Sequence, residues 1–533
     1  MMNIKANLVD LHQKTIYPAS ITIENGIIAS IERLSEDLES YILPGFIDAH
    51  IHIESSLLVP SEFARMAVLH GTVATVSDPH EIANVCGVKG VEYMIDNSKK
   101  VPFHFFFGAP SCVPATIYET AGATIESQEV EVLMQNDDIW YLAEMMNFPG
   151  VLFNDPSVLA KLQIAKKYNK PIDGHAPGLM GDDARRYFEA GPSTDHECFT
   201  YEEALGKIAL GMKVIIREGS AARNFDALIP LMKDHSNMLM FCSDDKHPDS
   251  LISGHINQLV TRALKKGHDI FDVLKVACIN PILHYGLPVG TLQVGDPADF
   301  IITSDLQEFK TIATYIKGHL VANEGQSLIP RIAIDDINQF NIDPIDLESI
   351  KYIINESENV IECLDGQLIT NKLIIEGKHC NVENDILKLV VVNRYNQTKP
   401  AISFIKNFGL KRGAMASSVA HDSHNIIATG TNDMDILNAI NEVIHHKGAL
   451  SAANGNEIKT LPLAVAGLMS DQDAWEVTNK YTDLDQYCKV IMGSTLRAPY
   501  MSLSFMALLV IPSLKLSDKG LFDGDKFQFM RLE

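Results

Sequence analysis

The sequence predicts an α/β protein built around a (β/α)8 TIM-like barrel, with a split β-sandwich domain from both flanks and a C-terminal α+β domain. Three observations predict this class. Short apolar runs alternate with helical stretches over about 240 residues, β-rich texture lies on both sides of them, and the pattern changes again near residue 330. A chain of 533 residues has room for about three domains. We therefore expect a barrel over residues 44–285, a small β domain from 1–43 and 286–330, and an α+β domain over 331–533.

The small β domain is predicted from hairpin signals. Residues 21–24 and 27–31 are β-rich and flank Asn25-Gly26, the pair that a type I′ turn favours because both central positions need a positive φ. Similar β-rich texture returns over residues 290–302 and around Lys317-Gly318. We expect the two segments to pair with each other beside the barrel.

The barrel and the C-terminal domain are predicted from periodicity. Apolar runs at residues 73–76, 214–216 and 238–241 are typical of buried strands, and residues 61–70 and 157–168 are typical of helices. Repeated strand–helix units of this total length favour a (β/α)8 barrel. Farther along the chain, residues 360–364 and 368–370 flank Asp365-Gly366 and predict another hairpin.

Charge and apolar patterning exclude some partners. The chain has 68 acidic and 44 basic residues, a net charge of −24, which argues against binding to a nucleic-acid backbone but not to a free base. The longest apolar stretch, residues 505–514, contains Pro512 and is too short to span a bilayer. Dispersed cysteines and an N-terminus without an apolar run favour a reducing compartment. We expect a cytoplasmic homo-oligomer without nucleic-acid or membrane partners.

The most informative motif places two histidines at the end of a predicted strand. His50 and His52 lie two residues apart and therefore project from one face, where they can bind one metal ion. Further candidate ligands follow at predicted strand ends: Glu144, His175, His196 and Asp244, with Asp245 as an alternative to Asp244. Four imidazoles and two carboxylates suit two divalent ions bridged by Glu144.

Several longer motifs resemble the bacterial-type adenine deaminases of the metal-dependent amidohydrolase superfamily. They lie at residues 44–56, 77–85, 145–151, 173–179, 217–224, 243–248, 420–425 and 461–470. The resemblance implies hydrolytic deamination of adenine to hypoxanthine and ammonia in purine salvage, by attack of hydroxide on C6. Glu144 stands where many superfamily members have a carbamylated lysine. The resemblance favours Mn²⁺ or Fe²⁺, and the ligand types also permit Zn²⁺.

The predicted site residues fall into three groups. The metal ligands are His50, His52, Glu144, His175, His196 and Asp244, and the catalytic residues among them are Asp244, Glu144 and His196. The expected substrate contacts are His80, Glu81, Arg217, Glu218 and Ser220. Alternatives stay open: the segment 78–81 could cap a helix, and Arg217 and Glu218 could form an ion pair that closes a turn. His421, Asp422 and His424 could reach the site or bind an ion, or could be structural in the C-terminal domain.

Other functions remain to be weighed against adenine deamination. The cytidine-type zinc deaminases need P-C-x-x-C, which the sequence lacks. Another amidohydrolase reaction on a cyclic amide or related nucleobase stays open, because the same barrel supports many reactions. A non-catalytic purine-binding protein is the third possibility, although a binder has no need of six metal ligands.

Overall fold

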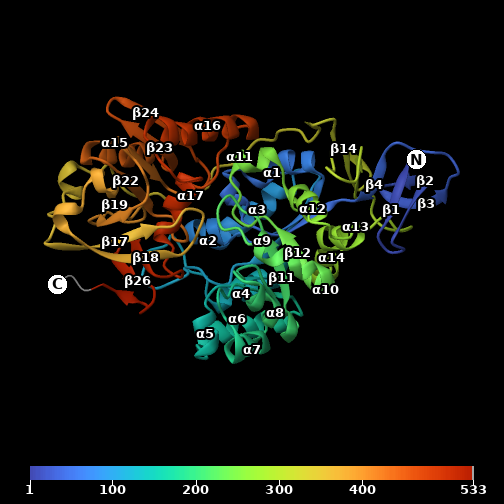
Figure 1. The fold of residues 1–533 in the computed structure, drawn as a ribbon, viewed down its shortest axis with the longest axis horizontal. Helices are drawn as coiled ribbons and strands as arrows, with labels where there is room; N and C mark the ends of the chain where they lie inside the picture. Colours follow the sequence, from blue (N-terminus) through green and yellow to red (C-terminus); the bar gives the residue numbers. More distant parts are fainter. Residues whose placement is uncertain (531–533) are drawn as a thin grey trace.

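The computed structural model describes residues 1–530, whose elements form three groups along the chain (Figure 1). The N-terminal strands lie at one end of the molecule, the C-terminal third lies at the other, and a barrel lies between them (Figure 1). None of the helices in residues 1–530 combines the length and the apolar character that a bilayer crossing requires.

Eight short parallel strands form the barrel. They pair in the orders β5–β6–β7–β8–β9 and β10–β11–β12. Their bounds are β5 Phe46–Ile51, β6 Thr72–Ser77, β7 His104–Ala109, β8 Ile139–Met145, β9 Ile172–Gly174, β10 Thr194–Asp195, β11 Lys213–Arg217 and β12 Leu239–Cys242. The N–H of Ser193 donates to the carbonyl of Ile172 at 2.8 Å and joins the two groups. At the other junction the N–H of Asp244 donates to the carbonyl of His50 at 3.0 Å, and the N–H of His52 donates to the carbonyl of Asp244 at 3.3 Å. The ring closes, so the predicted (β/α)8 barrel is confirmed.

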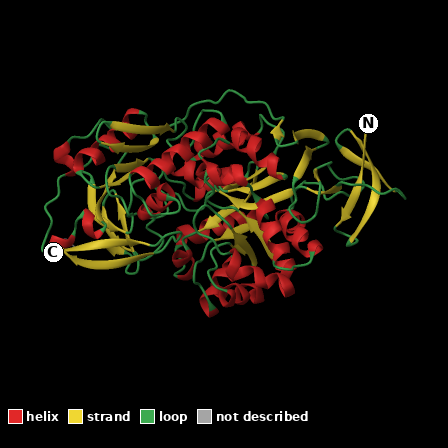
Figure 2. Ribbon diagram, turned by 45° about the horizontal axis from the view of Figure 1, so that its top comes forward, coloured by secondary structure: helices red, strands yellow, loops and turns green. Residues whose placement is uncertain are grey.

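Helices cover the outside of these strands (Figure 2). Their bounds are α1 Pro60–Ala67, α2 His80–Cys86, α3 Val88–Ser98, α4 Ser127–Met134, α5 Phe148–Leu152, α6 Pro156–Lys167, α7 Gly181–Ala190, α8 Tyr201–Leu210, α9 Phe225–Leu228, α10 Met232–His235, α11 Pro248–Ser253, α12 Ile256–Lys265, α13 Ile270–Leu274 and α14 Asn280–Tyr285. The helix predicted at residues 61–70 is α1 followed by a 3-10 turn, and the helix predicted at 157–168 is α6. Asp155 accepts the backbone N–H groups of Ser157 and Val158 and so caps α6.

Both flanks of the barrel contribute strands to one eight-stranded sheet, in the order β16–β15–β14–β13–β4–β1–β2–β3. The bounds are β1 Met2–Asp10, β2 Thr15–Glu24, β3 Ile27–Arg33, β4 Tyr41–Pro44, β13 Phe300–Thr303, β14 Thr311–Ile316, β15 His319–Asn323 and β16 Gln326–Ser327. Strand β13 pairs antiparallel with β4, so residues far apart in the sequence meet in one sheet. Asn25 and Gly26 have φ values of 51° and 79°, which confirms the hairpin between β2 and β3.

The C-terminal third contains a second eight-stranded sheet, in the order β18–β17–β20–β19–β22–β21–β23–β24. Its strands are β17 Ser357–Cys363, β18 Thr370–Glu376, β19 Ile386–Val392, β20 Ala401–Lys406, β21 Ala414–Ser417, β22 Ile426–Gly430, β23 Ala449–Asn454 and β24 Glu457–Pro462. The helices α15 Asp433–His445, α16 Ala474–Gln486 and α17 Pro499–Ser504 accompany it, as do β25 Leu514–Ser517, β26 Gly520–Asp523 and β27 Gln528–Phe529. The hairpin predicted around Gly366 is β17–β18, and its connection runs from residue 364 to residue 369.

Candidate active site

The six predicted metal ligands meet at one rim of the barrel and are all buried. Each lies at or just after the carboxyl end of a strand: His50 and His52 at β5, Glu144 in β8, His175 after β9, His196 after β10 and Asp244 after β12. The carboxyl ends of parallel strands share one face of a barrel, so ligands far apart in the sequence converge there.

Four of these side chains form a first group around His52. Its Nε2 lies 3.2 Å from Nε2 of His50, 3.1 Å from Oδ1 of Asp244 and 3.4 Å from Oε1 of Glu144. The Nε2 of His50 lies 3.7 Å from the same oxygen of Asp244. Three strand ends thus supply two imidazoles and two carboxylates to one small volume.

The other oxygen of Glu144 faces a second group. Oε2 lies 2.7 Å from Nδ1 of His175 and 3.1 Å from Nε2 of His196. Burial raises the pKa of Glu144, but His175 and His196 outweigh this, so the pKa lies well below its ordinary value and the carboxylate is ionised. Glu144 therefore presents one oxygen to each group.

The spacing of these atoms fits divalent ions. Metal–ligand bonds of about 2.0–2.2 Å place neighbouring ligand atoms of one ion about 2.8–3.6 Å apart. The distances around His52 and between His196 and Glu144 fall in that range. Buried atoms Nδ1 of His50, Nε2 of His175 and Nδ1 of His196 have no hydrogen-bond partner among the described residues. A divalent metal site is therefore consistent with both the donor types and their separations.

Arg217 forms buried ion pairs with Asp244 and Glu197. The Nη1 atom of Arg217 contacts Glu197 and lies 2.5 Å from Oδ2 of Asp244. Its Nη2 atom lies 3.1 Å from Oε2 of Glu197. Burial raises the pKa of Asp244. Arg217 and His52 lower it by more than this, so the pKa ends well below its ordinary value. The structure thus places Arg217 in a buried ion pair, the alternative that the sequence left open, although with Glu197 and Asp244 and not with Glu218.

His80 and Glu81 begin α2 and face the same rim. The carboxylate of Asp78 accepts the backbone N–H of His80 at 3.0 Å, so the predicted capping role is present. The His80 ring also lies 3.6 Å from Glu144 and 3.4 Å from Glu81. Capping and a position in the site are therefore compatible.

The C-terminal third reaches the site through two histidines. Nε2 of His421 lies 3.0 Å from Oε1 of Glu81, and Nε2 of His424 contacts the other oxygen. Burial raises the pKa of Glu81, but His421, His424 and His80 outweigh it, and the pKa lies well below its ordinary value. Asp422 lies 3.9 Å from His80. The segment that contains His421, Asp422 and His424 therefore contacts the barrel rim.

Two expected substrate contacts lie elsewhere. Glu218 pairs with Arg262 at 2.6 Å. The hydroxyl of Ser220 accepts the backbone N–H of His247 at 2.9 Å and donates to Ser250 at 3.0 Å. Among the described residues, neither Glu218 nor Ser220 lines the cavity next to the metal ligands. Their side chains instead order the loop after β11.

That cavity, which we call the catalytic cavity, has a free volume of about 30 Å³. It is lined by His52, His80, Glu81, Glu144, Met146, His175, His196, Glu197, Arg217, Asp244, Asp245, Leu368, His421, Asp422, Phe505, Leu508 and Val510. Sequence reasoning missed Glu197 and the four apolar residues after 360. The position of Glu197 beside His196 was the available signal for the first.

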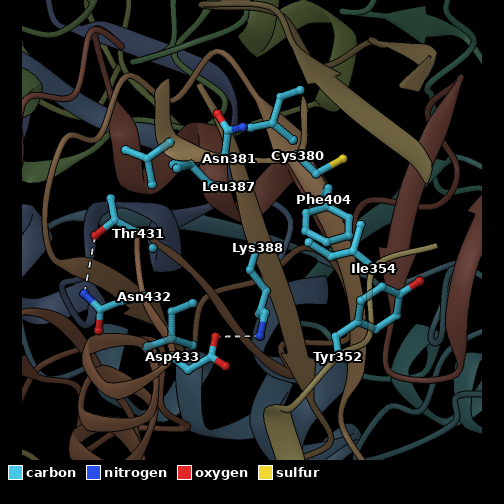
Figure 3. A pocket seen from close by; sticks show the side chains of 14 residues that line it. Tyr352, Ile354, Cys380, Asn381, Leu387, Lys388, Phe404, Thr431, Asn432 and Asp433 are labelled. Carbon is cyan, nitrogen blue, oxygen red and sulfur yellow. Dashed lines mark hydrogen bonds and ion pairs between the residues drawn. The ribbon is translucent and has the colours of Figure 1, made fainter. Parts of the chain in front are cut away.

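A larger hollow of about 220 Å³ lies in the C-terminal sheet (Figure 3). Lys388 is paired there with Asp433 at 2.5 Å, and Asn432 lies near Thr431 (Figure 3). Its lining contains no histidine or glutamate among the described residues. Size alone would therefore indicate the wrong place, and the donor chemistry favours the catalytic cavity.

Comparison with known proteins gives full-length matches. Residues 41–321 match the model of the amidohydrolase family, and residues 367–528 match that of the adenine deaminase C-terminal domain. The chain is 54% identical over 529 residues to a protein of Sulfurovum sp. (strain NBC37-1) named adenine deaminase, which covers 99% of each chain. It is 49% identical over 551 residues to one of the same name from Methanosarcina barkeri, which covers 100% of this chain and 99% of the relative.

Among solved structures, N-acetyl-D-glucosamine-6-phosphate deacetylase from Mycobacterium smegmatis matches 60% of this chain and 100% of its own, with a TM-score of 0.48 and 14% identity. The sequence relatives match over both the barrel and the C-terminal third. The chain therefore belongs to the adenine deaminase family of the amidohydrolases.

Proposed function

We propose that this protein hydrolyses adenine to hypoxanthine and ammonia with two divalent metal ions. The observation that carries the proposal is identity of about 50% to adenine deaminases along the whole chain, together with six buried ligands at the barrel rim. The donor set, four imidazoles and two carboxylates, permits Mn²⁺, Fe²⁺ or Zn²⁺, and the resemblance to adenine deaminases favours Mn²⁺ or Fe²⁺.

His50, His52 and Asp244 would hold one ion, His175 and His196 the other, and Glu144 both. Such ions lower the pKa of water and so supply hydroxide at neutral pH. Asp244 is suited to accept the proton, because one oxygen faces His52 at 3.1 Å and Arg217 fixes the other at 2.5 Å. The ionised state of Asp244 is required for that role.

The reaction then needs a proton on the purine before the amine leaves C6. Asp244 can return its proton to the ring nitrogen or the departing nitrogen. Glu81 lines the catalytic cavity as an ionised carboxylate held by His421 and His424, so it can first accept a proton released in the reaction and then pass it to the purine. His80 lies 3.4 Å from Glu81 and can orient the adenine ring.

The test pairs metal analysis of freshly purified protein with turnover assays. We expect two equivalents of a divalent metal, conversion of adenine to hypoxanthine by absorbance, and one ammonia per turnover. Assays with a panel of cyclic amides test the alternative function, an amidohydrolase reaction on a cyclic amide. Turnover of a cyclic amide without turnover of adenine, or full activity without metal, would refute the proposal. Tight adenine binding at full metal occupancy without product would favour the binding protein.

A further inference from the structure

Helix α8 places a buried lysine against the two loops that follow β9 and β10. Lys207 is only 1% exposed, and its Nζ has three acceptors, one for each hydrogen of an ammonium group. It donates to the carbonyl of Ala176 at 2.7 Å, to Oδ2 of Asp195 at 2.8 Å and to Oε1 of Glu203 at 2.7 Å. The hydrogen-bonding capacity of this ammonium is therefore used entirely inside the protein.

Two of these acceptors are direct neighbours in the chain of proposed metal ligands. Ala176 follows His175 in the sequence. Asp195 precedes His196 and, through its Oδ1 atom, accepts the backbone N–H of Glu197 at 2.7 Å. The Asp195 carboxylate therefore orders the turn on both sides of His196, and the lysine joins this turn to the backbone next to His175.

Glu203 holds the same two loops from the same helix. Its Oε1 accepts the backbone N–H of Gly178 at 2.8 Å, and its Oε2 accepts that of Phe199 at 3.0 Å. Glu203 and Lys207 are four residues apart and so lie on one face of α8. We call Lys207, Asp195 and Glu203 the loop clamp. It contains two buried carboxylates and one ammonium, so removal of the ammonium leaves both carboxylates without a cation.

The ligands next to the loop clamp belong to one half of the proposed metal site. His175 and His196 face the same oxygen of Glu144, at 2.7 and 3.1 Å, and their ring centroids lie 5.4 Å apart. We call the ion that these three residues would hold the second ion. The ligands proposed for the other ion lie in or after β5 and after β12, and none of the three hydrogen bonds of Lys207 reaches those segments.

We propose that Lys207 is a positioning residue that sets the separation of His175 and His196 and thereby the affinity for the second ion. The inference rests on the two-metal function proposed above. Lys207 does not line the catalytic cavity, so its effect on turnover passes through the two histidines. Loss of a group that orients metal ligands typically lowers metal affinity by about 10–100-fold.

The first experiment measures metal binding by Lys207→Met, with Lys170→Met as its matched control. Lys170 also donates to three carbonyls, those of Met134, Asn136 and Ile139, but these lie at the amino end of β8, opposite the ligands. The readout is the number of Mn²⁺ ions bound at equilibrium as a chelator lowers free Mn²⁺. We expect Lys207→Met to bind one Mn²⁺ as the wild type does and the other about 10–100-fold more weakly. In Lys170→Met both affinities should stay within about threefold of the wild type.

A double-mutant test identifies the ion that is affected. His175→Ala removes a ligand of the second ion and should leave one tightly bound Mn²⁺. Adding Lys207→Met to His175→Ala should change the affinity for this remaining ion by less than about threefold, because the loop clamp does not contact its ligands. Adenine turnover lost in Lys207→Met should return when Mn²⁺ is raised to saturation, which would not happen if the protein were misfolded.

Glu203→Gln is a milder variant that decides the matter if Lys207→Met does not fold. It keeps Lys207 paired with Asp195 and replaces one acceptor oxygen of the loop clamp by an amide group. We expect the same selective loss of one Mn²⁺, by about threefold or more. If Glu203→Gln or a folded Lys207→Met binds both ions as the wild type does, or binds both more weakly to the same extent, this inference is wrong. A wild type that binds no metal, or does not deaminate adenine, refutes the proposed function instead.

Discussion

Replacing Asp244 by asparagine separates chemistry from folding. Asn has the same shape as Asp but cannot accept a proton at neutral pH. It also weakens a metal ligand, because Oδ1 lies 3.1 Å from Nε2 of His52 in the shared ligand group. The substitution therefore removes the proposed base and disturbs one ligand set at the same time.

The size of both effects follows from the contacts. A positioned base contributes about 10²–10⁴-fold to the rate, or roughly 3–5 kcal/mol of barrier. Stability should fall much less, because Arg217 keeps its two-pronged contact with Glu197 and is not left as an unpaired buried charge. We expect kcat/KM to fall by at least about 10²-fold while the protein remains folded.

The assay is ammonia release from adenine, with metal content and circular dichroism measured on the same samples. Asp245→Asn is the matched comparison: Asp245 is the next residue, accepts the hydroxyl of Ser55 at 2.5 Å and lies 3.5 Å from His421. We expect a smaller loss there. Near-normal turnover by Asp244→Asn, or a larger loss in Asp245→Asn, would show that the assignment of the base is wrong.

Further predictions concern metals, the rim carboxylates and the buried side chain of Lys515. Chelation should abolish deamination, and added Mn²⁺, Fe²⁺ or Zn²⁺ should restore it to different extents; activity that survives verified metal loss contradicts the ligand assignment. Glu81→Gln should lower kcat/KM by about 10²-fold or more, whereas Glu218→Gln, whose carboxylate pairs with Arg262, should change it less than about threefold; equal effects would contradict their different placement. Burial lowers the pKa of Lys515 to about 7, so between that pH and its ordinary pKa the unfolded chain binds more protons and wild-type stability rises with pH. Lys515→Met lacks this titrating group. The free energy of unfolding of Lys515→Met minus that of the wild type, measured in urea, should therefore fall by roughly 2–3 kcal/mol from pH 7 to pH 9. A constant difference would show that Lys515 is charged in the folded state.

The barrel and its ligands could be predicted because each depends on local pattern. Apolar runs and the polar residues that follow them place His50, His52, Glu144, His175, His196 and Asp244 at strand ends, and the topology then brings them together. Individual contacts between distant residues need not be known for this, since the carboxyl ends of parallel strands in a barrel share one rim.

Contacts between distant segments could not be predicted in the same way. His424 meets Glu81 across 343 positions of sequence. Four further lining residues of the catalytic cavity are apolar and resemble those of any core: Leu368, Phe505, Leu508 and Val510. The sequence left open whether Arg217 contacts substrate or forms an ion pair; it lines the catalytic cavity, and its ion-pair partners are Glu197 and Asp244. These contacts depend on tertiary packing, which the pattern of a single sequence does not predict.

The junction between β12 and β5 has a consequence for the order of assembly during synthesis. The carbonyl of His50 and the N–H of Asp244 pair across it, so the backbone that closes the ring also carries the first and last of the proposed metal ligands. About 190 residues separate them, which at about 5–20 residues per second is roughly 10–40 s of translation. A ribosome-bound chain that has not yet released residue 244 cannot offer the complete donor set. The complete set of six proposed ligands therefore exists only after residue 244 has been synthesised.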